Sequence, residues 1–139
     1  MSRSFAVPLD AVDEVQVHAD GLTAVKRIVA DDPYLVGHYP GFPIYPGVFT
    51  VETVHQAARR AVEAGRGPGV RVELAAVRSV RFQAPLLPGD VLTAACRLRE
   101  DPDGGQRVRV DADCRRHDGE VTAKVSLELL VLSQEPADA

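Results

Sequence analysis

One proline-free segment, residues 47–64 (GVFTVETVHQAARRAVEA), constrains the fold of this chain more than any other part. Its apolar residues recur at the three- and four-residue spacing of an α-helix. Four prolines and three glycines fill residues 33–47 before it and disfavour regular structure there. Pro46 fits the first turn, where its missing N–H costs nothing, and Gly65 marks the predicted end. The sequence therefore predicts a rigid loop followed by one long helix.

The other patterned segments alternate apolar and polar residues, as strands do. Two strands within residues 12–29 are expected to form a hairpin about Ala19-Asp20-Gly21. Four more strands are predicted after the helix, at residues 70–82, 91–100, 106–116 and 120–132. Their short connections, including an Asp118-Gly119 dipeptide typical of tight hairpins, favour antiparallel neighbours.

One helix and about six strands make an α+β domain in which the helix packs against a mainly antiparallel sheet. The 139 residues fit a single domain, 1–139, with a loose tail expected at 134–139. The helix is apolar around much of its first three turns, so we expect the sheet to wrap around it. The long strands leave sheet edges, and we predict that two copies pair there as a dimer.

Charge and hydropathy lower the expectation for several classes of function. The formal net charge of −4 gives no overall field that would attract nucleic acid. No apolar run reaches the roughly 18 residues of a membrane span, and the start of the chain has no signal-like apolar segment. We therefore expect a protein that works in the cytoplasm, without nucleic acid or membrane as a partner.

The two cysteines are too few for a disulfide framework, and no Cys/His cluster indicates a metal site. If the strands on either side of the DPDGG turn pair directly, Cys96 lies opposite about Val110. Cys114 is then several residues away, on the order of 13 Å. Both are predicted to be buried, unpaired thiols.

Two titratable residues near the start of the helix are the main functional candidates. Glu52 interrupts the apolar run in the second turn, where a buried carboxylate needs a partner or a raised pKa. It can also lie along a solvated edge or bond to nearby backbone. His38 stands on the proline-stiffened loop, which suits a catalytic base, although a loop histidine beside an aromatic is often simply packed.

Gly47 adds a third chemical group. At a helix N-terminus its N–H has no intrahelical partner, and the lack of a side chain lets a substrate oxygen approach closely. A base, an acid and an oxyanion donor together suit removal of a proton next to a carbonyl with loss of a group one carbon further on.

Residues 37–56, GHYPGFPIYPGVFTVETVHQ, resemble the signature of the 3-hydroxyacyl-acyl-carrier-protein dehydratases of type II fatty-acid synthesis. In that family GHFPG, a PxxPG and a helix carrying EAMAQ follow at the same spacing. RSVRFQAPLLPGDVL, residues 78–92, resembles a later strand and turn of the family. The resemblance implies a hot-dog fold, in which a curved sheet wraps one long helix, and dimers or dimers of dimers with the site at the subunit interface.

The resemblance also implies a role for each site residue. His38 of one chain would take the C2 proton and face Glu52 of the other chain, which would position or protonate the departing hydroxyl. Gly47 N–H would hold the thioester oxygen, and the carbonyl of Ile44 would hold the imidazole of the histidine. The acyl chain would arrive on the phosphopantetheine of an acyl carrier protein, with no metal or redox cofactor.

Some residues depart from the family pattern or are expected at its margin. Phe42 replaces a basic residue and could reshape the mouth of a tunnel, and Tyr45 and Gln56 are expected to line the site. His55 replaces an alanine one helical turn after Glu52, so it either borders the site, pairs with the carboxylate, or packs in the core or a dimer contact. Four arginines are candidates for a basic rim that meets the carrier protein: Arg59, Arg60, Arg78 and Arg81.

Two alternatives to dehydration stay open. Hot-dog thioesterases also use a carboxylate on the central helix, but hydrolysis does not need the histidine at position 38. A noncatalytic partner subunit, within a heterodimer of two hot-dog chains, is the other alternative. Retention of both His38 and Glu52 favours catalysis over it.

Overall fold

A computed structural model gives the structure of the chain for residues 10–29, 44–101 and 105–133. The segment 30–43, which carries His38 and Phe42, and the predicted tail at 134–139 lie outside these described residues.

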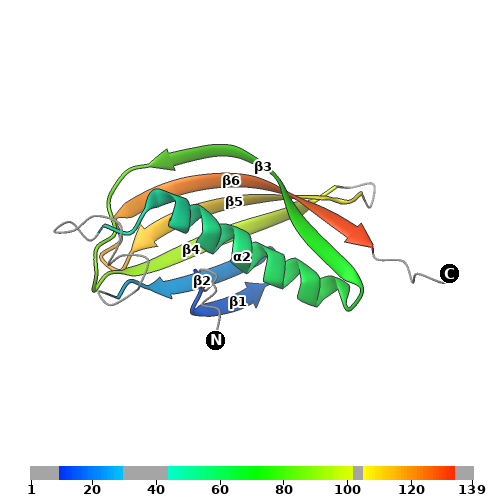
Figure 1. The fold of residues 1–139 in the computed structure, drawn as a ribbon, viewed down its shortest axis with the longest axis horizontal. Coiled ribbons are helices and arrows are strands. Elements are labelled where there is room, and N and C mark those ends of the chain that lie inside the picture. Colours follow the sequence, from blue (N-terminus) through cyan, green and yellow to red (C-terminus); the bar gives the residue numbers. More distant parts are fainter. Residues whose placement is uncertain (1–9, 30–43, 102–104, 134–139) are drawn as a thin grey trace, which may run out of the picture.

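Six antiparallel strands and one long helix make up the described fold, as the sequence pattern predicted (Figure 1). The strands form one sheet in the order β1-β2-β4-β5-β6-β3. In chain order the elements are β1 (Glu14–His18), β2 (Gly21–Arg27), α2 (Gly47–Arg66), β3 (Val70–Phe82), β4 (Val91–Glu100), β5 (Arg107–Arg116) and β6 (Val121–Ser133).

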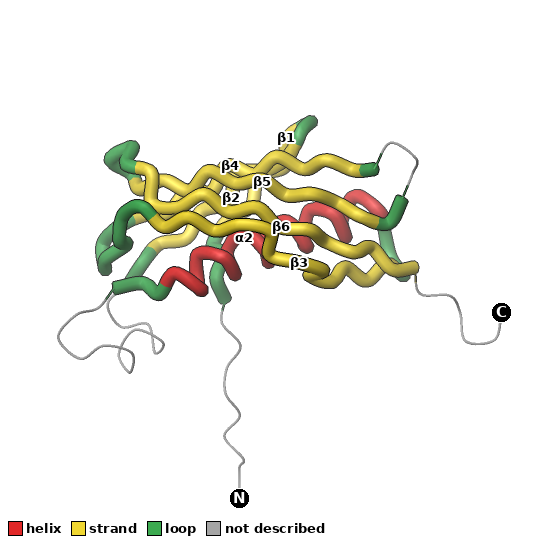
Figure 2. The backbone as a smooth tube through the Cα atoms, turned by 90° about the horizontal axis from the view of Figure 1, so that it is seen from above, coloured by secondary structure: helices red, strands yellow, loops and turns green. Residues whose placement is uncertain are grey.

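The core lies between α2 and one face of the sheet, and Figure 2 shows the helix running along that face. One side of the helix is buried there through Thr50, Thr53, Val54, Ala57, Ala58, Ala61 and Val62. Small residues on this side let the helix approach the strands closely. The sheet contributes alternate residues, among them the fully buried Leu92, Val110 and Leu127. Alternation along each strand is what places these side chains on a single face.

Strand β3 is an edge of the sheet, and it curves around α2 (Figure 1). Its pairing with β6 shifts twice, between Leu74 and Ala76 and between Val77 and Ser79. Extra residues of this kind bend a strand and change which side chains face inward. Leu74, Val77 and Phe82 all lie on the inner face. They pair with the buried Leu129, Leu127 and Ala123 of β6, yet they stand exposed along this edge strand.

The turn between β4 and β5 is wider than expected, which corrects the predicted register. Glu100 pairs with Val108, so Gln106 belongs to the turn rather than to the strand. Cys96 therefore lies opposite Ala112, not opposite Val110, and Cys114 lies opposite Ala94. The two thiols become diagonal neighbours across adjacent strands, closer than the sequence suggested, and both are buried and free, as predicted.

The helix also continues past its predicted end. Gly65 lies inside α2, and the chain turns at Gly67, whose φ of 86° favours glycine. The Gly67 N–H closes the last turn by donating to the carbonyl of Glu63 at 3.0 Å. In the part of the chain that the structure describes, no helix is both long and apolar enough to cross a membrane.

Candidate functional site

The N-terminus of α2 presents backbone donors that no side chain caps. Pro46 occupies the N-cap position, and the described residues give it no side-chain cap hydrogen bond. The first turn holds no acidic residue that would neutralise the positive end of the helix dipole. Gly47 therefore lies at the end of the helix whose dipole favours a partly negative oxygen.

Phe82, which is not among the residues predicted for the site, covers Gly47 from the end of β3. A Cβ atom built on Gly47 would lie 2.6 Å from Cζ and 2.8 Å from Cε1 of the Phe82 ring. Any larger residue at position 47 would force this ring to move. The signal was available, because Phe82 belongs to the RSVRFQAPLLPGDVL stretch that carried part of the resemblance, but the sequence does not show that its ring reaches the first residue of the helix.

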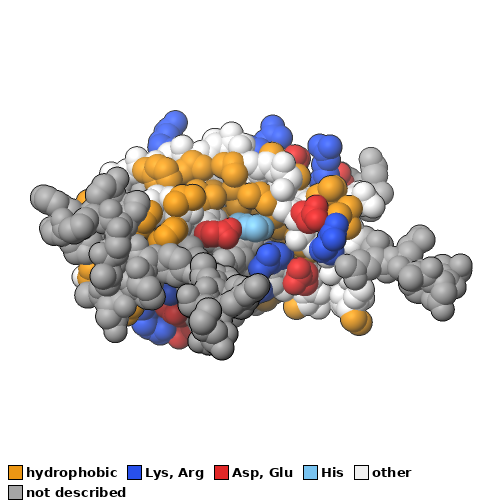
Figure 3. Space-filling view, in the orientation of Figure 1, with side chains coloured by type: hydrophobic (Ala, Val, Ile, Leu, Met, Phe, Trp, Pro, Cys, Tyr) orange, Lys and Arg blue, Asp and Glu red, His pale blue; other side chains and the backbone are white. Residues whose placement is uncertain are grey.

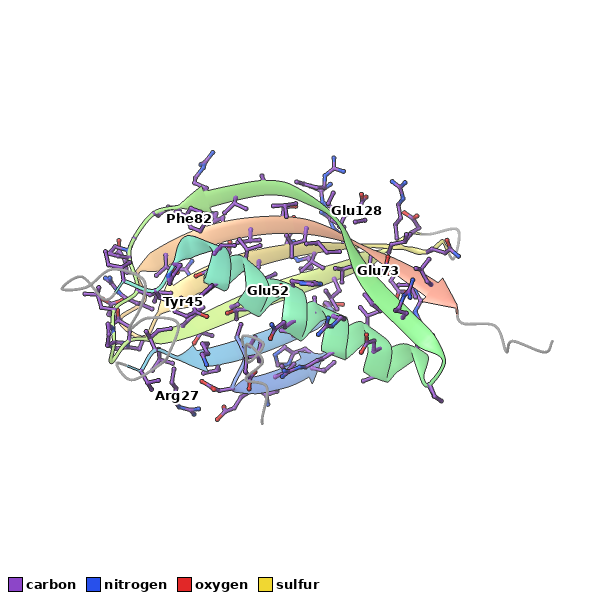
Figure 4. The ribbon with its side chains drawn as sticks, in the orientation of Figure 1. Arg27, Tyr45, Glu52, Glu73, Phe82 and Glu128 are labelled. Atoms are coloured by element: carbon purple, nitrogen blue, oxygen red, sulfur yellow. The ribbon has the colours of Figure 1, made fainter. Side chains whose placement is uncertain are left out.

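An open pocket of about 460 Å³ lies at this end of the helix. Its lining is largely apolar and includes Ile44, Tyr45, Gly47, Val48, Phe82 and Thr122. Figure 4 shows Tyr45 and Phe82 near the N-terminal end of α2, with Glu52 further along the helix. Glu52 does not line this pocket among the described residues.

Glu52 is half-buried in the single chain, with 35% of its side chain exposed, which lies between the buried and the solvated positions that the sequence left open. The described strands cover the opposite side of α2, so the carboxylate side faces outward. Figure 3 shows an acidic and a histidine side chain side by side over this part of the helix, with hydrophobic side chains along the side toward β3. Apolar surface therefore borders this polar pair on that side.

Two neighbours on the helix contact the Glu52 carboxylate. Oε1 lies 2.6 Å from Nδ1 of His55, and Oε2 receives a long hydrogen bond of 3.4 Å from Nε2 of Gln56. Of the readings that the sequence left open for His55, pairing with the carboxylate is the one that the structure shows. Gln56 lies beside Glu52 on the helix.

A segment before β1 holds this side of the helix in place. The Oε1 atom of Gln56 accepts the backbone N–H of Ala11 at 3.1 Å. The hydroxyl of Thr53 donates to the carbonyl of Ala11 at 2.8 Å and is completely buried. Because Gln56 is anchored at its oxygen, its amide nitrogen stays directed toward Glu52.

The remaining predicted residues divide between pocket and core. Ile44 is 37% exposed and lines the pocket, but its proposed contact to His38 falls outside the described residues. Tyr45 is mostly a core residue, 4% exposed, and its ring packs edge-on against Phe49 with centroids 5.4 Å apart. Phe42 lies outside the described part of the chain.

The cysteines do not offer a nucleophile. Burial, the largest cause, raises the pKa of the Cys96 thiol to about 12, and burial likewise raises the pKa of Cys114 to about 12. Both thiols stay protonated near neutral pH, and only the thiolate is strongly nucleophilic. Within the described ranges, no three His, Cys, Asp or Glu side chains lie together as a metal site would require.

The arginines proposed for a carrier-protein rim lie on α2 and β3. Arg60 pairs with Asp10 at 3.4 Å, and Arg78 lies 3.9 Å from Glu128. Exposed pairs of this kind contribute little to stability and leave the guanidinium accessible to a partner.

Comparison with known families gives a match across most of the chain. The model of the ApeI-like family, described as ApeI dehydratase, matches residues 14–124. The 3-hydroxyacyl-acyl-carrier-protein dehydratase FabZ of Polynucleobacter necessarius is 33% identical over 113 residues, covering 81% of this chain and 74% of that protein. FabZ of Pseudothermotoga lettingae is 32% identical over 121 residues, covering 86% of this chain and 84% of that protein.

Solved structures with the same fold are more distant in sequence. A thioesterase from Haemophilus influenzae has a TM-score of 0.70 at 16% identity, covering 91% of this chain and 82% of that chain. A thioesterase superfamily member from Thermus thermophilus has a TM-score of 0.67 at 18% identity, covering 81% of this chain and 80% of that chain. A hot-dog-like protein from Thermanaerovibrio acidaminovorans has a TM-score of 0.67 at 19% identity, covering 88% of this chain and 83% of that chain. These similarities confirm the predicted hot-dog fold.

Proposed function

This chain belongs to the ApeI-like dehydratase family, and from that premise we propose that it dehydrates 3-hydroxyacyl thioesters carried by an acyl carrier protein to trans-2-enoyl thioesters. The observation that carries the proposal is the family match over residues 14–124, a range that includes His38, Gly47 and Glu52. The structure adds that Gly47 and Glu52 stand on the first two turns of the same helix.

In the proposed reaction His38 removes a proton from C2 while the thioester oxygen accepts a hydrogen bond from Gly47 N–H. The helix dipole favours the negative charge that develops on this oxygen. Glu52 donates a proton to the C3 hydroxyl, the C3–O bond breaks, and water leaves as the C2–C3 double bond forms. His38 ends protonated and Glu52 ionised, so a proton returns to Glu52 before the next turnover.

We further propose that each site is shared between two chains. Gly47 and Glu52 are five residues apart, which places them about 140° apart around the helix axis and about 7.5 Å apart along it. Glu52 does not line the pocket beside Gly47 among the described residues, which supports a site completed by the carboxylate of a second copy. The edge strand β3, with Leu74, Val77 and Phe82 exposed, is the proposed place of pairing in a homodimer, a dimer of dimers or a heterodimer.

The carrier protein and the pathway are also part of the proposal. Arg59, Arg60, Arg78 and Arg81 are proposed to meet an acidic carrier protein, whose phosphopantetheine would deliver the acyl chain. The reaction fits fatty-acid synthesis and equally a polyketide or polyene pathway. As proposed it needs no metal or redox cofactor, because the N–H donor and the two titratable residues supply its chemistry. The proposed compartment is the cytoplasm, where free thiols stay reduced.

Mass spectrometry of carrier-protein thioesters tests the function directly. Incubation with 3-hydroxyacyl thioesters of several chain lengths is expected to give loss of water, and the reverse reaction should hydrate the enoyl thioesters. Free acid as the product would instead indicate a thioesterase. No change with any chain length would indicate a binding or partner subunit and would refute the proposal.

A further inference from the structure

The contact between Glu52 and His55 differs from an ordinary ion pair on a helix surface. The two residues are three apart, a spacing at which side chains on a helix meet. Only 15% of the His55 side chain is exposed, and its Nε2 atom is buried without a hydrogen-bond partner among the described residues. A solvated pair that served only helix stability would keep both of its polar ends in water.

This buried nitrogen also argues against packing as the sole role of His55. A buried polar atom without a partner reduces stability, and an apolar side chain would fill the same space without that cost. The family signature has alanine at this position, so the fold does not require a histidine. The favourable part of the arrangement is the short contact between Nδ1 and the carboxylate, at 2.6 Å.

That contact makes the two carboxylate oxygens unequal. Nδ1 and Oε1 share one proton, whichever of the two atoms carries it, so Oε1 is occupied. Oε2 receives the Gln56 amide at 3.4 Å, a distance at the limit of hydrogen bonding. Oε2 is therefore the oxygen that is available to another group.

We propose that His55 is a positioning residue for Glu52: it binds Oε1 through Nδ1 and so directs Oε2 toward the departing C3 hydroxyl. This inference rests on the proposed dehydration and assigns a further residue to it. His55 does not touch the substrate in this arrangement. Its effect passes through the carboxylate, whose orientation and proton it holds, while Gln56, anchored on Ala11, limits rotation from the other side.

Three variants of His55 separate positioning from packing. The side-chain amide of His55→Asn places a nitrogen near the former Nδ1, whereas that of His55→Gln reaches the region of Nε2. His55→Ala removes both. A misplaced catalytic group can cost up to about 100-fold in rate, so we expect kcat to fall about 10- to 100-fold in His55→Ala and His55→Gln, with KM little changed. His55→Asn should restore most of the rate.

His18→Ala is the matched control, because that histidine is exposed and bonds Thr23 at 2.9 Å on the β1–β2 hairpin. It should keep the wild-type kcat. Equal losses of kcat in His55→Asn and His55→Gln, or a normal kcat in His55→Ala, would overturn the inference. A fall in thermal stability that accounts for the lost rate, with KM and kcat changing together, would assign His55 to packing and also overturn it.

Nuclear magnetic resonance of ¹⁵N-labelled histidine checks the contact without any turnover. The His55 imidazole signals, assigned by their loss in His55→Asn, should show a strongly hydrogen-bonded Nδ1 that changes in Glu52→Gln. Unchanged signals in that variant would refute the pairing even if the wild type is active. If the wild type dehydrates no substrate but the signals do change, the proposed function fails together with the role of His55 in it, and a structural contact remains.

Discussion

Replacement of Gly47 by alanine tests the oxyanion role that the proposed mechanism gives to its N–H. The new methyl carbon would lie 2.6 Å from Cζ of Phe82, whereas ordinary van der Waals contact begins at 3.4 Å. In the single chain 56% of Phe82 is exposed, so its ring has room to turn away. A strained rotamer costs about 0.5–1.5 kcal/mol, so we expect the variant to fold with only a modest loss of stability.

The effect on rate should be far larger than the effect on stability. The methyl group would stand beside the N–H that the thioester oxygen approaches, and loss of one oxyanion donor typically lowers kcat by about 100- to 1000-fold. Dehydration kinetics and thermal unfolding of Gly47→Ala measure the two effects on the same preparation. A stability loss of about 1 kcal/mol corresponds to a few degrees in Tm for a domain of this size.

The double variant Gly47→Ala with Phe82→Ala identifies the cause. Removal of the ring relieves the clash, so Tm should recover toward that of Phe82→Ala alone, while kcat stays low because the methyl group still blocks the donor. A recovery of kcat in the double variant would show that displacement of Phe82 caused the loss. Near-native kcat in Gly47→Ala itself would refute the assignment of the oxyanion donor.

The other predictions concern the acid, the core and the thiols. Glu52→Gln cannot donate the proton to the leaving hydroxyl, so turnover should fall severely with an unchanged circular dichroism spectrum, and wild-type turnover would remove the carboxylate from the mechanism. Leu127→Ala, at a fully buried position of β6, should lower the free energy of unfolding by about 2–5 kcal/mol in urea titration, and a loss well below this would contradict the assigned core. Burial raises the pKa of Cys96 and Cys114 from an ordinary value of 9.0 to about 12, so their contribution to stability is complete below pH 9 and is lost as pH rises toward 12. Between pH 9 and 12 the unfolding free energy should fall less steeply in the double variant Cys96→Ala, Cys114→Ala than in the wild type. Equal slopes in the two proteins would contradict the raised pKa values of the thiols.

The strands and the helix could be predicted because hydrophobic periodicity reports burial directly. Alternation along residues 91–100 placed Leu92, Ala94 and Cys96 on one face, and the structure has all three buried. The pairing register of β4 with β5 across the DPDGG turn could not be predicted, because the number of residues in a turn depends on the conformation of the turn. Glycines likewise mark helix ends only approximately, and Gly67 rather than Gly65 adopts the positive φ that ends α2.

The site was predicted in its residue types more than in its contacts. Glu52, Gly47 and Gln56 lie on the helix as their spacing required, but the partner of the carboxylate depended on side-chain rotamers that sequence leaves open. Phe82 was missed because an alternating pattern gives the face on which a strand residue lies but not the part of the helix that it meets, here Gly47.

The central claim is that an acid and a base from different chains form one site, and complementation between inactive variants tests it most directly. His38→Ala and Glu52→Gln should each be inactive alone. In a mixed dimer that combines the two, one of the two sites regains both residues, so random mixing should restore about a quarter of wild-type activity. Co-expression of the two variants, with dehydration followed by mass, makes the measurement. Mixed dimers that form and remain inactive would contradict the account.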